Sequence, residues 1–289
     1  MSKNKKIETS QDKKVALTMG ITNNWAFAGA TILFGLKDNT PKIPHDLIIY
    51  ENDLSSKNKK LLNQIYPCIF KKFDISRIYA GDFTRLSKMT FSRYENFSLL
   101  KNYSTVVWLD ADILIKRDIS ELLQHFSKGI AMHKHKGIPI KSGMRENIKN
   151  YNLEKEAFAA GSLILTDTLK NPETLKEWCY EKTNEWASKV NGDMQILNLM
   201  LQEFNIEPYE LDETYCCHPK RENADTRIVH PWWRKKFWNE IIDPQWDHYY
   251  KKWIAMGGEG PKLPHPIKRY IKYKLWKTGL LKKHGKNYL

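Results

Sequence analysis

The stretch TVVWLDADILIKRD, residues 105–118, decides how the rest of this chain is interpreted. An apolar and β-branched run at 106–109 leads into Asp110-Ala111-Asp112, after which the apolar run resumes. This pattern predicts a strand buried on both faces, with two carboxylates at its tip. Such carboxylates need a cation or a set of donors, and two oxygen ligands one residue apart can converge on Mg²⁺ or Mn²⁺. The alternative is that both acids begin a turn, because the motif is short.

The chain before this strand alternates between strand and helix. Residues 15–19 and 45–50 are predicted strands, residues 26–39 and 55–65 are predicted helices, and 20–25 have the composition of a loop. This order predicts an α/β fold with a parallel, helix-covered sheet, whose ligand site lies at the carboxyl ends of its strands. Asp110 and Asp112 are expected at that edge, which favours a metal–diphosphate site over a simple turn.

Composition limits the partners. The 289 residues carry a formal net charge of +14, for which nucleic acid, phosphorylated ligands and an anionic membrane are candidate partners. No apolar run approaches the roughly 20 residues of a membrane span. Residues 1–14 lack the apolar core of a signal peptide and are predicted to be disordered, so we expect a cytoplasmic protein. Its four cysteines include no CxxC pair, which agrees with reduced thiols.

Two helices are predicted to present charged side chains at the same edge of the sheet. Residues 91–103 show helical spacing, and Arg93 on the first turn would offer a guanidinium to phosphate or sugar. Residues 191–198 begin another helix, with Asp193 in its first turn. The alternatives are a solvated surface side chain for Arg93 and a structural helix cap for Asp193.

The remaining segments are assigned from local pattern. We predict a short amphipathic helix at 119–126, an irregular loop over the active site at 133–150, a small-residue turn at 158–161 that leads into a buried strand, and a helix at 175–188. Beyond Tyr209 the chain is irregular and aromatic. There IVHPWWRKKFW, residues 228–238, combines His230 with a cationic cluster in which Lys236 is within reach of a diphosphate. A lone histidine is otherwise a core or surface residue.

The C-terminal stretch, residues 264–289, contains many lysines and no acidic residue. Ile267, Tyr270, Ile271 and Leu275 recur in it at helical spacing. Basic residues around an apolar and aromatic stripe are typical of an interfacial membrane helix, to which each Lys or Arg adds about 1 kcal/mol near an anionic leaflet. The alternative is a solvated basic tail. Nucleic-acid binding fits the charge alone, because no recognition-helix, zinc-finger or RNP-like signature is present.

Four stretches together resemble, in order and spacing, the retaining glycosyltransferases of family 8, the group that includes glycogenin and bacterial lipopolysaccharide galactosyltransferases. They are SRYENFSLLKNYSTVVWLDADILIKRDISELL, AFAAGSLILTDTL, NGDMQILN and HPWWRKKFW. LDADILI matches the family's LDxD strand, and the spacing from His230 to Lys236-Phe237-Trp238 matches its HxxGxxKPW element. The resemblance covers roughly residues 15–240.

This resemblance implies a GT-A-type fold, with a Rossmann-like mixed sheet flanked by helices. The catalytic domain would cover residues 15–260, and residues 261–289 would form a basic, amphipathic, membrane-associating tail. It implies that Asp110, Asp112 and His230 bind Mn²⁺, with Mg²⁺ as an option. It also implies contacts to a UDP-sugar donor, from Thr22 and Asn24 to the uridine, from Arg93 and Lys236 to the diphosphate or sugar, from Asp193 to the sugar hydroxyls and from Asp110 to the ribose.

The chain departs from the family pattern at several positions. Ala159 replaces the Asn of the FNAG turn, and Met194 replaces a polar residue of the DQD motif, discussed as a nucleophile or acceptor contact. KPW becomes KFW through Phe237, and Trp233 stands where the family has Gly. These changes leave the identity of the sugar open, while the diphosphate half is better preserved. With Met194 unable to act as a nucleophile, front-face attack with Asp193 positioning the sugar is the favoured mechanism.

The resulting hypothesis is a retaining transferase that moves glucose or galactose from a UDP-sugar to a saccharide or glycolipid acceptor in lipopolysaccharide, lipooligosaccharide or other surface glycan synthesis. It would lie on the inner face of the cytoplasmic membrane as a peripheral protein that does not bind nucleic acid. Two alternatives stay open. One is a metal-dependent phosphotransferase or phosphatase that uses Asp110 as nucleophile. The other is a non-catalytic, basic membrane- or nucleic-acid-binding protein.

Overall fold

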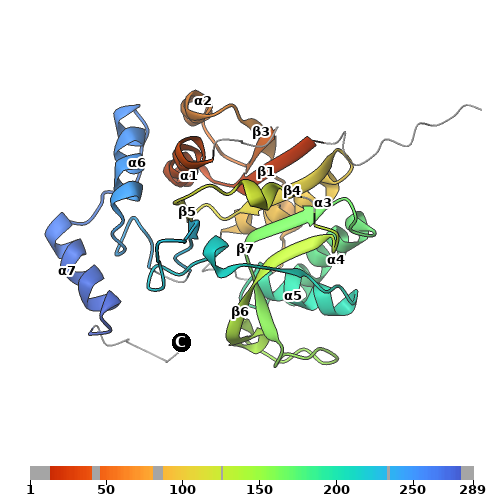
Figure 1. Cartoon of the computed structure of the whole chain (residues 1–289). Coiled ribbons are helices and arrows are strands. Elements are labelled where there is room, and N and C mark those ends of the chain that lie inside the picture. The colour runs from red at the N-terminus through yellow and green to blue at the C-terminus, as the bar shows by residue number, and fades with distance from the viewer. Residues whose placement is uncertain (1–13, 41–45, 81–86, 125, 233–234, 281–289) are drawn as a thin grey trace, which may run out of the picture.

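The computed structural model describes residues 14–40, 46–80, 87–124, 126–232 and 235–280, and within these ranges a mixed seven-stranded sheet forms the centre (Figure 1). The strand order is β3-β2-β1-β4-β7-β6-β8. The strands are β1 (Lys14–Gly20), β2 (Asp46–Glu51), β3 (Ile69–Lys72), β4 (Tyr103–Leu109), β6 (Ile130–Pro139), β7 (Glu156–Thr166) and β8 (Tyr209–Leu211). A separate two-stranded ribbon pairs β5 (Leu114–Ile115) with β9 (Ile228–Val229).

Helices cover both faces of this sheet (Figure 1). They are α1 (Ala26–Asn39), α2 (Ser56–Ile65), α3 (Asn96–Leu99), α4 (Pro172–Glu185), α5 (Asp193–Glu203), α6 (Pro244–Ala255) and α7 (Pro266–Lys277). Short 3₁₀ helices occur at Asn23–Trp25, Ile75–Arg77, Lys88–Glu95, Ser120–Leu123, Ile140–Gly143 and Glu213–Tyr215. α1, α2 and α6 contribute to one apolar core, while α4 and α5 contribute to a second core on the opposite face.

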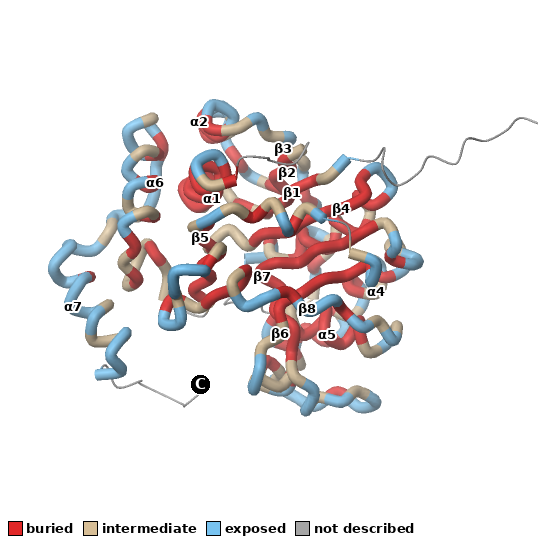
Figure 2. Tube along the Cα trace, viewed as in Figure 1, coloured by how far each residue is buried: buried red, intermediate tan, exposed pale blue. Residues whose placement is uncertain are grey.

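The strand β4 divides these two cores. All seven of its residues are buried, and Figure 2 shows the central strands as the most buried part of the tube. Val106 and Trp108 belong to the core with α4 and α5, whereas Val107 and Leu109 belong to the core with α1, α2 and α6. Successive side chains of a strand point to opposite faces, so only a strand covered on both sides has this uninterrupted apolar run. The prediction of a doubly buried strand is confirmed.

The predicted parallel sheet is confirmed for four of the six strand pairings, including β6 with β8, and wrong for the two pairings of β7. β1 pairs in parallel with β2 and β4, and β2 with β3. β7, however, runs antiparallel to both β4 and β6. Apolar runs report burial on both faces but not strand direction, and β7 is buried without being parallel. The mixed sheet implied by the resemblance is the one found.

Several local assignments need correction. Residues 91–103 do not form one helix, since a 3₁₀ helix ends at Glu95, α3 spans four residues and Tyr103 already belongs to β4. Residues 158–161 are part of strand β7 and not a turn. The segment 133–150 is not one irregular loop, because β6 extends to Pro139 and pairs with β7. At 119–126 only a four-residue 3₁₀ helix forms. In each case pairing with a distant strand or packing outweighs local helical spacing.

The C-terminal helix α7 lies against the end of the molecule beside α6 (Figure 1). Arg269 is only 4% exposed and donates to Asp247 Oδ1 at 2.8 Å, to Ile241 O at 2.7 Å and to Phe237 O. Ile267 and Ile271 remain exposed on the outer side. None of the helices in the described ranges is long and apolar enough to span a membrane. Residues 1–13 and 281–289, parts of the predicted N-terminus and tail, lie outside the described residues.

Candidate active site

The acidic pair lies directly after β4, as predicted, and its first member is held by three groups. Asp110 Oδ1 accepts from Arg93 at 2.7 Å and from the indole of Trp108 at 2.8 Å, and the Asp110 amide donates to Gly161 O at 3.0 Å. Oδ2 lies 3.6 Å from His230 Nε2. The held oxygen orients the carboxylate, so the other oxygen faces the imidazole.

The second acid, Asp112, repeats this arrangement. Its Oδ2 accepts from Lys236 Nζ, and its Oδ1 lies 3.3 Å from His230 Nε2. Lys236 also donates to Pro231 O at 2.6 Å, which holds its side chain in place. Burial acts to raise the pKa of Asp112, but Lys236 and His230 outweigh burial and hold that pKa well below its usual range. Asp112 is therefore a carboxylate at neutral pH, with one oxygen directed at His230.

The ribbon of β5 and β9 brings His230 to the acidic pair. Leu114 pairs with Val229 in antiparallel register, so the residue that follows β9 lies next to the residues that precede β5. The His230 amide donates to Cys217 O at 2.8 Å, and Nδ1 lies 3.6 Å from Cys216 Sγ. Burial acts to lower the pKa of His230, but Asp112 outweighs it and raises this pKa to about 10. Beside Asp112, the His230 imidazole is therefore protonated at neutral pH when no cation is bound.

These three side chains fit a divalent cation. One ligand atom each from Asp110, Asp112 and His230 lies within 4.8 Å of the others. Two carboxylate oxygens and one imidazole nitrogen form a donor set suited to Mn²⁺ or Mg²⁺, with further positions open to ligand oxygens. A bound cation would take the place of the proton on His230, because metal ligation requires the neutral imidazole. The predicted metal ligands are therefore brought together.

Gly161 makes room for this cluster. A Cβ atom at this position of β7 would lie 2.2 Å from His230 Cε1, 2.4 Å from His230 Nδ1 and 3.3 Å from Asp110 Oδ2. Only a residue without a side chain leaves the imidazole its space. The sequence shows Gly161 as the last residue of a small-residue stretch, and its steric role depends on the position of His230. Two further residues of the site are not predicted from the sequence. Trp108 donates to Asp110, and Cys216 faces His230. The position of Trp108 two residues before Asp110 is the sequence feature that could have indicated its role.

Arg93 and Asp193 form the wall behind the acidic pair. Arg93 is 2% exposed, and Nε, Nη1 and Nη2 donate to Thr90 O, Ala160 O and Asp110. Its Nε also lies 2.8 Å from Asp193 Oδ2, in ion-pair contact without hydrogen-bond geometry because its N–H points to Thr90 O. The solvated-surface alternative for Arg93 is wrong. Its contact with a diphosphate stays a prediction, since all three nitrogens already have protein partners.

Asp193 is the first residue of α5 and is 5% exposed. Burial raises its pKa to about 6, against the opposing effect of Arg93 and with a contribution from Asp110. Gly192 occupies the N-cap position, and the Asp193 carboxylate meets both Arg93 and the backbone amides of Asp193 and Met194 at the start of α5, so the predicted role at the helix start and the contact with Arg93 coexist. A buried acid with a raised pKa beside a charged partner, here Arg93, is a common feature of functional sites. Its predicted contact with a sugar stays a prediction.

The remaining predicted positions lie around this centre. Thr22 is half-buried and Asn24 exposed in the loop after β1, the neighbour of β4, and their contacts to uridine stay predictions. Asn23 between them, missed from the sequence, fixes the loop because its Oδ1 accepts from Ser55 N at 3.0 Å and Asn58 Nδ2 at 2.9 Å.

Three of the departures from the family pattern fall on packed positions. Ala159 is buried in β7, and Met194 packs against the apolar core. Phe237 is fully buried and stacks on Trp246, with ring centroids 5.9 Å apart. Trp233 lies outside the described residues.

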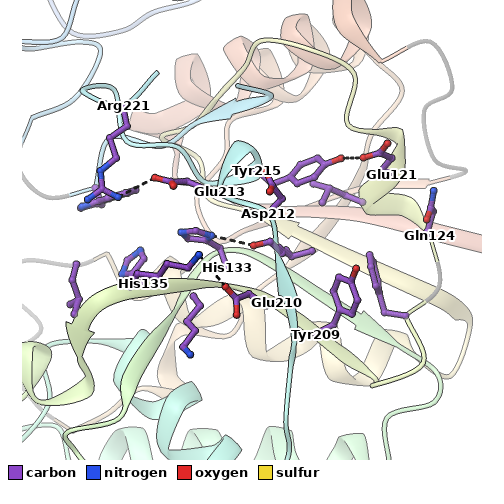
Figure 3. Close-up of a pocket in the computed structure, with 17 residues that line it drawn as sticks. Glu121, Gln124, His133, His135, Tyr209, Glu210, Asp212, Glu213, Tyr215 and Arg221 are labelled. Atoms are coloured by element: carbon purple, nitrogen blue, oxygen red, sulfur yellow. Dashed lines mark hydrogen bonds and ion pairs between the residues drawn. The ribbon is translucent and has the colours of Figure 1, made fainter. Parts of the chain in front are cut away.

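A pocket of about 680 Å³ lies beside β6 (Figure 3). Trp232 is part of its wall, and the Trp232 ring lies 6.0 Å from the His230 ring, measured between centroids. His133 and His135 of β6 and residues of β8 and the following 3₁₀ helix line the other sides. The pocket therefore adjoins the metal cluster through Trp232.

Comparisons with known proteins agree with this geometry. A model of glycosyl transferase family 8 matches residues 16–242. No curated protein sequence matches the chain. The matched range includes the acidic pair, Arg93, Asp193, His230 and Lys236.

Solved structures share the fold. The bifunctional glycosyltransferase WbbM is similar with a TM-score of 0.61 and 18% identity, over 91% of this chain and 52% of that chain. The galactosyltransferase LgtC, solved with donor and acceptor sugar analogues, is similar with a TM-score of 0.61 and 12% identity, over 88% and 99%. GlyE from Streptococcus pneumoniae TIGR4 has a TM-score of 0.54 and 15% identity, over 86% and 65%. The chain spans about half the length of WbbM, and the shared fold is of the predicted GT-A type.

Proposed function

The chain belongs to glycosyl transferase family 8, whose members transfer sugars with retention, and from that premise we propose that it moves a glucosyl or galactosyl group from a UDP-sugar to a saccharide acceptor. The observation that supports this is the convergence of Asp110, Asp112 and His230, whose ligand atoms lie within 4.8 Å of one another at the carboxyl end of β4. Nucleotide sugars carry a diphosphate, and a divalent ion bound by carboxylates commonly takes phosphate oxygens as further ligands.

The residues of the chain have distinct roles in this proposal. Asp110 Oδ2, Asp112 Oδ1 and His230 Nε2 would hold Mn²⁺ or Mg²⁺, which when bound supplies Lewis-acid stabilisation of the leaving diphosphate. Lys236 already holds Asp112 and contributes positive charge beside the same group. Arg93 orients Asp110 and lies against Asp193. Preorganised charges of this kind need no rearrangement when negative charge develops on the leaving group.

Retention is proposed to proceed by front-face attack, without a covalent intermediate on the protein. Met194 lacks the polar side-chain group that the family has at this position, and its side chain packs on the core. Asp193 is directed at Arg93 and is proposed to position the hydroxyl groups of the donor sugar. A glycosyl adduct trapped on Asp193 and found by mass spectrometry would overturn this mechanism.

The test of the donor half measures UDP release from UDP-glucose and UDP-galactose with Mn²⁺. We expect release with one or both donors, and its loss in Asp112→Asn, because that change removes one charge from the metal ligands. Asp225→Asn is the matched control, since Asp225 is exposed and outside the site. Absence of UDP release, with or without acceptor, for both donors and both Mn²⁺ and Mg²⁺ would contradict the proposal.

We further propose that the acceptor is a glycolipid of surface glycan synthesis, and that α7 holds the enzyme on the inner face of the cytoplasmic membrane. Ile267, Tyr270 and Ile271 are 65%, 52% and 52% exposed, and lysines flank them. Exposed apolar residues among cations favour insertion into an anionic lipid surface.

Deleting residues 265–289 would also remove the buried Arg269, so substitutions in the outer face of α7 test this proposal more cleanly. Ile267→Asp with Ile271→Asp is expected to reduce sedimentation with vesicles of phosphatidylglycerol and phosphatidylethanolamine. Ile75→Asp is the control, because Ile75 is an exposed isoleucine on another face of the chain. Equal sedimentation of the native and doubly substituted proteins would contradict membrane attachment through α7.

A further inference from the structure

The pocket beside the metal cluster has a charge balance that differs from the rest of the chain. Its lining includes four acids and three cations, which gives one net negative charge while the histidines are neutral, whereas the whole chain carries +14. The acids are Glu121, Glu210, Asp212 and Glu213, and the cations are Lys134, Lys136 and Arg221. An anionic ligand would be expected where positive charge accumulates, so this pocket is an unfavourable place for one.

The three cations of the lining already have carboxylate partners. Arg221 donates to Glu213 at 3.0 Å, as Figure 3 shows. Lys136 lies 3.9 Å from Glu210, and Lys134 lies 3.2 Å from Glu156 outside the lining. A phosphate or carboxylate that entered the pocket would share these cations with the carboxylates that already neutralise them, and would meet the remaining acids as like charges.

The histidines of the pocket do not supply the missing positive charge. Burial lowers the pKa of both His133 and His135, and that of His135 to about 4. His133 Nδ1 lies 3.3 Å from Leu211 O, whereas His135 Nε2 is buried without a hydrogen-bond partner among the described residues. A neutral imidazole nitrogen can donate to or accept from a hydroxyl group. His135 therefore lines the pocket as a neutral ring, which suits an uncharged ligand.

Aromatic rings form the second part of the binding surface. The Trp232 ring is flanked by His135 at 5.1 Å and His218 at 4.7 Å, measured between ring centroids. Near the other end of the pocket Phe126 and Tyr209 lie 4.9 Å apart. Ligand pockets combine apolar and aromatic surface with a few placed polar groups, in a volume of roughly 300–1,000 Å³, and this pocket meets that description. A sugar ring, apolar on its C–H faces and polar at its rim, has the matching character.

We infer that this pocket binds the terminal sugar ring of the acceptor and selects an uncharged ring, with Trp232 and His135 as specificity-determining contacts, and that it rejects rings that carry a phosphate or carboxylate. The inference rests on the proposed transferase function, for which the acceptor must lie beside the metal cluster. It extends that proposal by defining the chemical class of the acceptor residue.

Saturation-transfer NMR with the full chain, UDP and Mn²⁺ tests the inference. The neutral probes are methyl β-D-galactopyranoside and methyl β-D-glucopyranoside, and the anionic probes are methyl β-D-galacturonide and the 6-phosphate of methyl β-D-glucopyranoside. We expect saturation transfer to a neutral probe and at least tenfold weaker binding of its anionic counterpart. Equal or tighter binding of the anionic probes, or no binding of any probe, would overturn the inference.

Three substitutions connect the result to this pocket. Trp232→Leu and His135→Ala are each expected to weaken binding of the neutral probe, by up to roughly tenfold, through loss of ring surface in the pocket wall. His248→Ala is the control, because His248 is exposed on α6 outside the pocket lining. Glu213→Gln frees Arg221 and is expected to strengthen binding of the galacturonide. Unchanged binding in all three pocket variants would place the sugar elsewhere.

Failure of this inference can be distinguished from failure of the proposed function. UDP release from UDP-glucose and UDP-galactose without acceptor reports the donor half alone. If UDP release is present but the anionic probes bind as well as the neutral ones, the transferase stands and the acceptor class is wrong. If UDP release is absent with and without acceptor, the transferase proposal fails, whatever sugar the pocket prefers.

Discussion

Replacing Gly161 by alanine adds one methyl group to β7, at the point where His230 faces the acidic pair. The added Cβ would lie 2.2 Å from His230 Cε1 and 2.4 Å from His230 Nδ1. Ordinary van der Waals contact begins near 3.4 Å, so the imidazole must move by about 1.2 Å to make room. The neighbouring Asp110 Oδ2, at 3.3 Å, has far less need to move. The substitution therefore acts mainly on one of the three metal ligands.

A displacement of this size is large for metal coordination, where ligand distances hold to roughly ±0.2 Å. His230 cannot keep its place in the cluster. Disturbing groups that orient metal ligands typically costs about 10–100-fold in metal affinity, which corresponds to about 1.4–2.7 kcal/mol. We expect Gly161→Ala to weaken Mn²⁺ binding by this factor and to lower UDP release in parallel at limiting metal.

Isothermal titration with Mn²⁺ measures the effect, and urea unfolding in EDTA shows whether the fold is intact. His230→Ala supplies the matched background, because it removes the ring that the new methyl group would meet. In that background Gly161→Ala is expected to change Mn²⁺ affinity by less than twofold. The reasoning is refuted if Gly161→Ala alone leaves the affinity within twofold of the native chain, or if it weakens binding equally in both backgrounds.

Three further predictions concern stability, each measured by urea unfolding. Arg269→Met leaves Asp247 and two backbone carbonyls without their buried donor and is expected to lower the free energy of unfolding by about 3–5 kcal/mol. The control Lys268→Met, at an exposed position, should change it by no more than about 0.5 kcal/mol. Equal effects of the two substitutions would contradict the buried role of Arg269. Asn198→Ala removes two hydrogen bonds to the backbone of Phe158, at 2.7 and 2.8 Å, and should cost about 1–3 kcal/mol for each group left unpaired; a loss below 0.5 kcal/mol would contradict this. Burial raises the pKa of Asp193 from 3.8 to about 6. The contribution of Asp193 to the free energy of unfolding is therefore fully present below pH 4 and is lost as the pH rises through 6, on the order of 3 kcal/mol in total. In EDTA, Asp193→Asn should reduce the decline in stability between pH 4 and 7, and an unchanged slope would refute the assignment.

Much of the architecture was predictable because it depends on local pattern. The strand at 15–19, the helices at 26–39 and 55–65, and the buried strand before Asp110 all occur close to their predicted bounds. The family resemblance predicted the mixed sheet and is confirmed by the matched family model. Hydrophobic periodicity and uninterrupted apolar runs indicate which faces of a segment are buried. These strands and helices could be predicted because their burial follows directly from that pattern.

Local pattern predicted less where long-range pairing decides the backbone. Residues 133–139 are polar and basic, yet they form part of β6 because their backbone groups pair with β7. Helical spacing predicts Arg93 on the first turn of a helix, whereas it lies in the last turn of a 3₁₀ helix, buried among carbonyls and carboxylates. Its guanidinium is satisfied by groups as distant in sequence as Ala160 and Asp193, which no short window contains.

The sequence by itself determined that two carboxylates end a doubly buried strand, because only that burial explains the run from Val106 to Leu109. The tertiary structure alone decided how these acids are held. It places His230 against Asp112 through the pairing of β5 with β9, and it leaves the imidazole its space through the missing side chain of Gly161. These contacts join residues more than 100 positions apart, or depend on distances of a few ångströms between strands. Such relations arise from packing of the whole chain, so residue type and spacing do not encode them locally.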